Sequence, residues 1–199
     1  MRSSCRAVPS QLYAAALVAF AAACAGSAAQ VRPKALDHSP ASLYPLGTGY
    51  AWSYDVETSG EPPVLAIARV ASFANGVATV VTGPEASQRY AVSDLGIQRV
   101  GQPGYLLKAP IATGATWESG LGTSARVASM TEELKTEAGS FSACVRVDER
   151  NATSGQHVQT TYCPGVGPAL VVSEMQVRGQ TIQVTARLRG YSLEPEEAP

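Results

Sequence analysis

A pattern that occurs twice is the strongest constraint on what this chain can fold into. Residues 45–52 read PLGTGYAW and residues 110–117 read PIATGATW, and both follow the order Pro, aliphatic, small, Thr, Gly, two variable residues, Trp. These segments hold the only two tryptophans of the chain. Two further echoes keep the same order, namely ARVASF at 68–73 with ARVASM at 125–130, and YAVSDLGI at 90–97 with YCPGVGP at 162–168. The repetition predicts one β-rich unit built twice.

Most of the remaining sequence is typical of short strands. Segments rich in β-branched and aromatic residues, bounded by Gly, Pro or Asn-Gly, lie at 77–82, 89–92 and 141–148. Apolar and polar residues alternate over 182–189, which is the period of a strand with one wet face. Asn75-Gly76 and Arg178-Gly179 stand where hairpin turns belong. One segment, 130–138 (MTEELKTEA), fits either a turn of helix or the long end of a hairpin.

These segments predict an all-β fold, a curved antiparallel meander of about eleven strands that resembles a half-barrel. Each repeated unit supplies five strands, and a terminal strand over 181–191 completes the count. A parallel sheet is excluded because the connections are short and no long helix intervenes. In each unit a proline is expected to start the first strand, and a glycine to permit the bend that turns the tryptophan onto the core. These structural positions are Pro45, Gly49 and Trp52 in the first unit and Pro110, Gly114 and Trp117 in the second.

The N-terminus has the pattern of a signal peptide over residues 1–24. Arg2 and Arg6 precede an apolar, Ala-rich run that is too short to span a membrane. Small residues at 27–29 suit ordinary cleavage before Gln30. An alternative is that residues 21–24 (AAAC) act as a bacterial lipobox, in which Cys24 is lipidated and anchors the protein to a membrane. The sequence leaves both alternatives open.

Composition divides the rest of the chain into a linker at 25–42, one β domain at 43–192 and a disordered tail at 193–199. The linker lacks periodicity, and the tail is acidic and broken by proline. Charged residues make up 16% of the chain, and without Arg2 and Arg6 there are 13 basic residues against 16 acidic ones, a net charge near −3. No basic stripe remains, so binding to nucleic acid or to an anionic membrane surface has no electrostatic support.

Two of the four cysteines are expected to form a disulfide. Export removes Cys5 and leaves Cys24 either lost or lipidated, so Cys144 and Cys163 remain as a pair in an oxidising compartment. A hairpin of 141–150 with 156–163 that pairs Arg150 with His157 places the two cysteines opposite each other. Strand alternation then puts the bridge on the polar face of the hairpin. A zinc site that uses both thiols and His157 lacks a fourth ligand.

Four segments together resemble a group of bacterial secreted proteins and lipoproteins of unknown function. The group shows a Tyr-Pro-Leu-x-x-Gly-x-x-Trp-x-Tyr opening, a Gly-x-Phe strand that ends in Cys and Val, and a Tyr-x-Pro-Gly-Val-Gly near the C-terminus. Cys163 departs from this pattern, since members often have Ala there. The resemblance implies secretion and β structure, and it supplies no catalytic residues. Some envelope proteins of this kind have a curved half-barrel, like that of periplasmic lipoprotein chaperones, which is an analogy for the shape expected here. The matching segments are YPLGTGYAWSY (44–54), PIATGATW (110–117), AGSFSACVRV (138–147) and YCPGVGPALV (162–171).

The sequence offers no catalytic, cofactor or metal motif. His38 lies in the predicted linker and His157 beside a hairpin turn, and there is no Gly-x-Ser-x-Gly, His-Glu-x-x-His, phosphate-loop or Cys-x-x-Cys pattern. Asp148 and Glu149 cannot act as a carboxylate pair, because neighbours on a strand point to opposite faces. The aromatic residues at 44, 50, 52, 54 and 117 suit a core better than a ligand groove.

The predicted function is therefore that of a non-catalytic cell-envelope protein. It is expected to be periplasmic, anchored to the outer membrane or secreted, and to act by binding or assembly with an unknown envelope partner. The alternative is a carrier or chaperone that holds an apolar ligand or lipid in its curved sheet. A solid core favours the first function, and an unfilled apolar concave face favours the second.

Overall fold

The computed structural model describes residues 36–83 and 86–194. Within these ranges the chain forms one short helix, α1, Pro40–Leu43, and twelve strands. The predicted signal peptide, the lipobox at Cys24 and residues 195–199 of the predicted tail lie outside the described residues. The strands are β1 Ala51–Thr58, β2 Val64–Ala74, β3 Val77–Thr82, β4 Ala86–Ser93, β5 Gly96–Arg99, β6 Leu107–Lys108, β7 Thr116–Gly120, β8 Thr123–Thr136, β9 Gly139–Asn151, β10 His157–Cys163, β11 Gly167–Val177 and β12 Gln180–Ser192.

No helix in the described ranges is long and apolar enough to cross a membrane.

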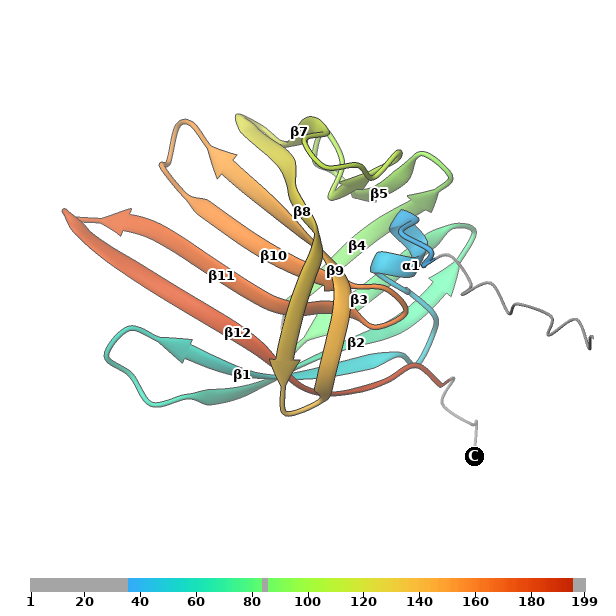
Figure 1. Ribbon diagram of the computed structural model, residues 1–199, viewed down its shortest axis with the longest axis horizontal. Helices are drawn as coiled ribbons and strands as arrows, with labels where there is room; N and C mark the ends of the chain where they lie inside the picture. The colour runs from blue at the N-terminus through green and yellow to red at the C-terminus, as the bar shows by residue number, and fades with distance from the viewer. Residues whose placement is uncertain (1–35, 84–85, 195–199) are drawn as a thin grey trace, which may run out of the picture. The chain divides into compact units, whose positions relative to one another are not determined.

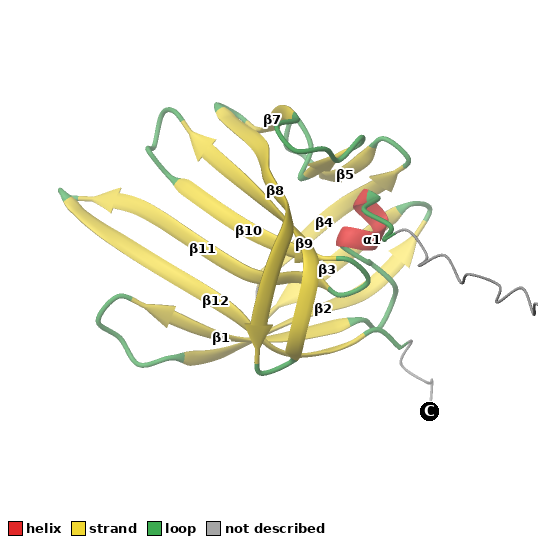
Figure 2. Ribbon diagram, in the orientation of Figure 1, coloured by secondary structure: helices red, strands yellow, loops and turns green. Residues whose placement is uncertain are grey.

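The strands form one antiparallel sheet that curls into a nearly closed, barrel-like shape (Figures 1 and 2). Their order is β6-β5-β4-β3-β2-β1-β12-β11-β10-β9-β8-β7, so two six-stranded meanders meet where β1 pairs with β12. The two outer strands are held together through the segment before β6. There the Tyr105 N–H donates to the Glu118 carbonyl at 2.8 Å. The curl therefore brings the two ends of the sheet back to each other.

The predicted fold class is confirmed, and the strand count differs by one. Each meander has six strands instead of five. The predicted terminal strand is the sixth strand of the second meander, and its counterpart in the first meander is β6. β6 is only two residues long, which is too short to show an alternating pattern in the sequence.

The two meanders repeat each other at the turn before their first strands. Gly49 and Gly114 have φ of 87° and 84°, in the left-handed region that glycine adopts without steric cost. Their N–H groups donate to the carbonyls of Val70 and Val127, at 2.9 and 2.8 Å. These valines are the central residues of the two ARVAS segments, and a register shift follows each of them. The sequence repeat is thus a structural repeat.

The prolines of the repeat do not start strands, contrary to the prediction. Pro45 and Pro110 each lie six residues before the strand, because the glycine turn comes between the proline and the first strand residue. The bend attributed to the glycine is present, and it separates the proline from the sheet.

The two tryptophans hold equivalent positions on the inner face of the sheet. Trp52 and Trp117 each pair with the alanine that begins an ARVAS segment, and both rings are buried. Each indole N–H donates to a backbone carbonyl of the other meander. Trp52 reaches Val166 at 2.7 Å, and Trp117 reaches Tyr105 at 2.8 Å. The repeated tryptophans therefore join the two halves of the sheet as well as filling its core.

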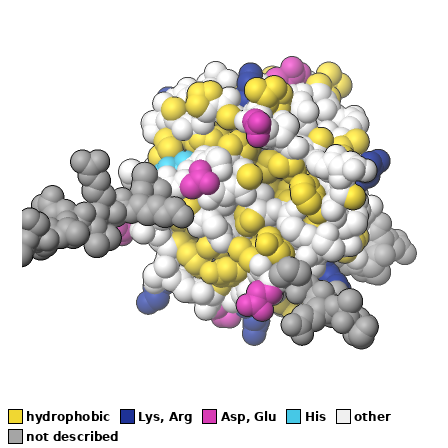
Figure 3. Space-filling view, turned by 90° about the vertical axis from the view of Figure 1, so that its right-hand side faces the viewer, with side chains coloured by type: hydrophobic (Ala, Val, Ile, Leu, Met, Phe, Trp, Pro, Cys, Tyr) yellow, Lys and Arg dark blue, Asp and Glu magenta, His cyan; other side chains and the backbone are white. Residues whose placement is uncertain are grey.

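The segment before β1 is part of the fold, so the predicted end of the linker at residue 42 is wrong: residues 40–43 form α1. Ser39 caps the helix by accepting a hydrogen bond from the Ser42 N–H at 3.2 Å, and Pro40 occupies its first turn. Leu43 is fully buried. A single helical turn has no periodicity, which is why the sequence suggested a linker. The face of the molecule on which α1 lies carries many hydrophobic side chains, with only a few acidic and basic ones among and around them (Figure 3).

The hairpin of β9 and β10 has the predicted register, and it holds the predicted disulfide. Arg150 pairs with His157, and the sulfurs of Cys144 and Cys163 are 2.03 Å apart. The bridge is buried in the core, so its predicted place on a polar face is wrong. Ala143 has φ of 53°, which breaks the alternation of the strand next to the cysteine. The disulfide also excludes the alternative zinc site, because the two cysteine sulfurs are bonded to each other.

The segment 130–138 is the end of a long hairpin and not a turn of helix. β8 runs to Thr136 and pairs with β9 from Gly139 onward. Its side chains alternate between half-buried and exposed over residues 131–138. The sequence was ambiguous here because its apolar residues, Met130, Leu134 and Ala138, are spaced by four, which suits both structures.

Replacing either tryptophan should destabilise the fold strongly. Trp52→Ala and Trp117→Ala are each expected to lower the free energy of unfolding by about 3–5 kcal/mol, because each removes a buried ring. The measurement is urea denaturation, with Leu95→Ala as the control, since Leu95 is 65% exposed. A loss below about 1 kcal/mol for either tryptophan, the range usual for surface positions, contradicts the equivalence of the two sites.

The disulfide should be present in the exported protein. Peptide mapping without reductant is expected to recover a Cys144–Cys163 linked pair. The double variant Cys144→Ala/Cys163→Ala should lose on the order of 3 kcal/mol of stability, because the bridge restrains the unfolded chain. Two free thiols in protein isolated from outside the cytoplasm would be the contrary result.

Candidate functional site

A polar cavity lies where the barrel-like sheet closes. Its volume is about 600 Å³, within the range of small-molecule sites. Its walls come from both meanders, since β5 and the loop after it face the ends of β7, β8, β9 and β10. The residues that carry its chemistry are Arg99, Gln102, Ser119, Thr123, Glu149 and Val158.

An ion pair between the two meanders crosses this cavity. On β5, Arg99 lies two residues after Ile97, so the two side chains point to the same face of the sheet. Ile97 is fully buried, and the Arg99 side chain therefore points inward. Glu149 on β9 pairs with Val158 on β10 and Ala125 on β8, which share the inner face. Arg99 Nη1 lies 3.4 Å from Glu149 Oε1, and the two side chains are 24% and 8% exposed. The pair is thus largely shielded from solvent.

The polar groups of the cavity are only partly satisfied. Arg99 Nη1 also donates to the Ser119 carbonyl at 3.0 Å. Among the residues that the structure describes, Arg99 Nε and Nη2 and Glu149 Oε2 make no hydrogen bond. The Ser119 hydroxyl is buried and has no partner in the same ranges. An unsatisfied buried polar group costs about 1–3 kcal/mol, and a ligand or ordered water that bonds to the Ser119 hydroxyl would remove this cost.

Buried tyrosines surround the inner side of the ion pair. Burial raises the pKa of the Tyr162 hydroxyl far above its usual value near 10, and the negative charge of Glu149 raises it further. Burial also raises the pKa of Tyr90, an effect that the positive charge of Arg99 opposes. For Arg99, burial alone would lower the pKa, but Glu149, through its charge and hydrogen bond, together with Tyr162 and Tyr90 outweighs burial, so the net pKa is raised. The guanidinium therefore stays charged beside neutral phenols.

Tyr44 lies at the centre of an aromatic group in the core. Its ring centroid lies 5.5 Å from that of Trp52, 5.7 Å from Tyr90 and 6.5 Å from Tyr162. Burial, followed by the neighbouring phenols, raises the pKa of Tyr44 well above its usual value. The interior at this level is solid core, as the aromatic composition predicted.

One part of the inner face, formed by β1, β11 and β12, is mainly apolar and half-buried. Val56 on β1 pairs with Ala186 on β12, which pairs with Val171 on β11. In the next row Val184 pairs with Ser173. These inward-facing residues are half-buried, so this surface is less completely filled than the aromatic core.

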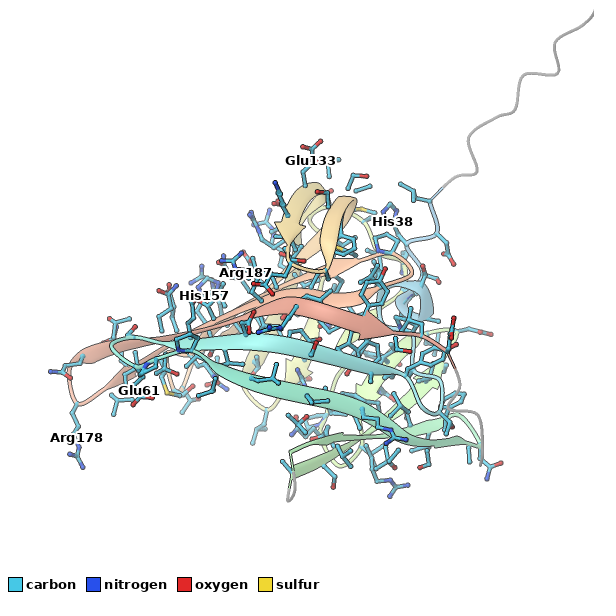
Figure 4. The ribbon with its side chains drawn as sticks, turned by 90° about the horizontal axis from the view of Figure 1, so that it is seen from below. His38, Glu61, Glu133, His157, Arg178 and Arg187 are labelled. Atoms are coloured by element: carbon cyan, nitrogen blue, oxygen red, sulfur yellow. A yellow bond between two sulfur atoms is a disulfide. The ribbon has the colours of Figure 1, made fainter. Side chains whose placement is uncertain are left out.

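Neither histidine lies in the cavity. Figure 4 shows His38, before α1, and His157, on β10, at well-separated places. His38 Nε2 lies 3.0 Å from the Ala143 carbonyl oxygen. Asp148 and Glu149 face opposite sides of β9, as their adjacency predicted: Asp148 lies near Arg146 and Gln159 on the outer face. Within the described ranges, no group of three or more His, Cys, Asp or Glu side chains is placed to hold a metal ion.

Sequence reasoning missed Arg99, Gln102 and Ser119. A signal for Arg99 was present, because the period of two from the buried Ile97 places residue 99 on the same face. No comparable signal marks Ser119, whose environment depends on how the two ends of the sheet meet.

Comparison with known proteins gives two distant structural likenesses. No family model and no curated protein matches the chain. A Bacteroides fragilis protein classed as exported, with a YmcC-like fold, matches at TM-score 0.45 and 14% identity, covering 75% of this chain and 98% of that one. A Parabacteroides distasonis protein classed as a lipoprotein matches at TM-score 0.43 and 12% identity over the same shares. At these values neither indicates a function for this chain, and the motif-based resemblance stays a prediction.

The buried tyrosines should make the fold sensitive to alkali. Above about pH 10, tyrosines ionise in the unfolded chain, while Tyr162 stays protonated in the folded protein. The free energy of unfolding, which is constant with respect to this group at lower pH, therefore falls by up to about 1.4 kcal/mol per pH unit for each such tyrosine. Tyr162→Phe is expected to make the fall in unfolding free energy between pH 10 and 11 smaller by about 1 kcal/mol, because the unfolded tyrosine is only partly ionised at the start of this interval.

Urea denaturation at a series of pH values measures this slope. Leu188→Val is the control, because it changes the buried core without changing an ionisable group. It should lower stability equally at every pH. An unchanged slope in Tyr162→Phe would show that this phenol ionises in the folded protein.

Proposed function

We propose that this protein is an exported, non-catalytic binding protein of the bacterial cell envelope, and that the polar cavity is its ligand site. The observation that carries the proposal is a cavity of about 600 Å³ that holds the buried, unpartnered Ser119 hydroxyl beside the Arg99–Glu149 ion pair. Preformed cavities of about 300–1,000 Å³ with a few convergent polar groups are the usual form of small-molecule sites.

Export is supported by the signal-peptide pattern and by the disulfide. A basic start, a short apolar run and small residues precede the fold. Disulfides persist mainly outside the cytoplasm, and the pairing of Cys144 with Cys163 suits such a compartment. Lipidation of Cys24 would hold the protein at a membrane, while cleavage before Gln30 would release it to the periplasm or the medium.

A binding role suits the cavity better than catalysis does. Glu149 is engaged by Arg99 and not by a nucleophile, and the buried Ser119 hydroxyl has no base as a partner among the described residues. Nucleophilic catalysis by serine needs a base within hydrogen-bond reach. The arrangement instead offers fixed donors and acceptors, which orient a bound molecule.

A second candidate is a carrier of an apolar ligand, favoured by the half-buried row of Val56, Ala186 and Val171 on the inner face. The aromatic core limits the depth available to such a ligand, because Tyr44, Trp52 and their neighbours fill the interior. The polar cavity therefore has the stronger support.

Filling the cavity mouth should remove the ligand. Gln102 is exposed on the cavity rim, and Gln102→Trp is expected to block the cavity without changing the core. Gln176→Trp on the exposed end of β11 is the matched control. Native mass spectrometry of the full chain, purified gently from its membrane fraction, should find a small molecule with the wild type and the control but not with Gln102→Trp. The same spectra report the state of Cys24.

Three outcomes would contradict the proposal. Equal ligand occupancy in both variants would place the site elsewhere, and a bound lipid acyl chain would favour the apolar carrier. A folded variant among Asp148→Asn, His157→Gln and Glu174→Gln that alone abolishes the cellular role would point to an active site outside the cavity. Chemical denaturation of each variant verifies that it is folded.

A further inference from the structure

We propose that the ligand of this cavity carries no net charge and presents a hydrogen-bond acceptor and donor side by side, as an amide group does. This inference rests on the proposed function and adds the chemical class of the ligand. It follows from three properties of the Arg99–Glu149 pair: its charges cancel, its bonding is incomplete, and both partners line the cavity.

The charges of the cavity balance. Arg99 and Glu149 bear opposite charges 3.4 Å apart, and the carboxylate is almost fully buried. The other residues named in the wall, Gln102, Ser119 and Thr123, are polar and neutral. An anion or cation entering this site would gain one partner and face one like charge, in a place where solvent compensates poorly. A neutral molecule meets no such penalty.

The pair leaves bonding capacity on both partners. Charge-assisted N–H···O bonds are usually about 2.7–2.9 Å long, so the 3.4 Å contact between Nη1 and Oε1 is loose. A guanidinium has five N–H donors and a carboxylate two acceptor oxygens. Within the described ranges, only Nη1 and Oε1 are used. The remaining groups can bind a ligand without breaking the pair.

An amide complements these free groups. Its carbonyl oxygen can accept from the guanidinium while its N–H donates to Oε2 of Glu149. The two bonds are made by one planar group of no net charge. The buried Ser119 hydroxyl offers a further donor or acceptor in the same wall. Val158 provides apolar contact for the remainder of the ligand.

Three probes of equal size distinguish the ligand classes: propionamide, propionate and propylammonium. Each is titrated into the exported protein while backbone amide shifts are followed by NMR. In the wild type the cavity amides of Gly101, Gly120 and Asn151 should respond to propionamide at concentrations about tenfold lower than to either ion, since two hydrogen bonds to charged groups are gained without an opposed charge.

Single-charge variants should reverse this selectivity. Glu149→Gln keeps the shape and leaves the Arg99 charge alone, so propionate should become the best of the three probes. Arg99→Gln leaves the carboxylate alone, so propylammonium should become the best. Glu118→Gln and Arg126→Gln, at exposed positions outside the cavity, are the matched controls and should keep the preference for propionamide. If Arg99→Gln does not fold, the Glu149→Gln result decides.

The outcomes separate this inference from the proposed function. If propionate or propylammonium binds best to the wild type at the cavity amides, the proposed ligand class is wrong while the cavity remains the site. The same conclusion follows if Glu149→Gln keeps the wild-type preference. If no probe moves the cavity amides in the wild type or in either charge variant, the cavity is not a ligand site and both proposals fail.

Discussion

The ladder between β1 and β12 is the interaction on which the rest of the structure depends. It joins the first and last strands of the domain, and it places Tyr54 beside Leu188. Since β1 and β12 are neighbours, the opposite ends of the two meanders, β6 and β7, become the edges of the sheet. Twist and curl then bring those edges together, where the Tyr105 N–H bonds to the Glu118 carbonyl. An edge that would otherwise invite pairing with other chains is thereby covered.

The repeated tryptophans strengthen this closure from inside. Each indole N–H donates to a backbone carbonyl of the other meander. Both tryptophans of the chain therefore connect the two halves of the sheet. The approach is close enough to require glycine: a Cβ on Gly167 would lie 2.9 Å from the Trp52 ring nitrogen, and Gly167 has φ of 114°. This contact gives a physical reason for the last glycine of the YCPGVGP segment.

The closure also explains why a polar cavity occurs in a domain with an aromatic core. Arg99 and Glu149 lie on inner faces that would be apolar in a uniformly packed barrel-like sheet, and they meet only where the edges approach. A buried ion pair rarely repays its desolvation, so its presence is weak evidence for a role in stability. Its unused donors and acceptors fit a role in binding better.

Local chemistry in the sequence by itself determined the architecture. Asn75-Gly76 and Arg178-Gly179 have positive φ at both residues and make the predicted hairpin turns. A two-residue hairpin turn needs this conformation, which glycine adopts readily, so the glycines mark the turns in the sequence. The spacing of turn and cysteines set the β9–β10 register. Only the tertiary structure decided the burial of the disulfide, the docking of Leu43 and the meeting of Arg99, Ser119 and Glu149. Turns and periodicity act between near neighbours, whereas these contacts join residues that approach one another only after the whole sheet has curled.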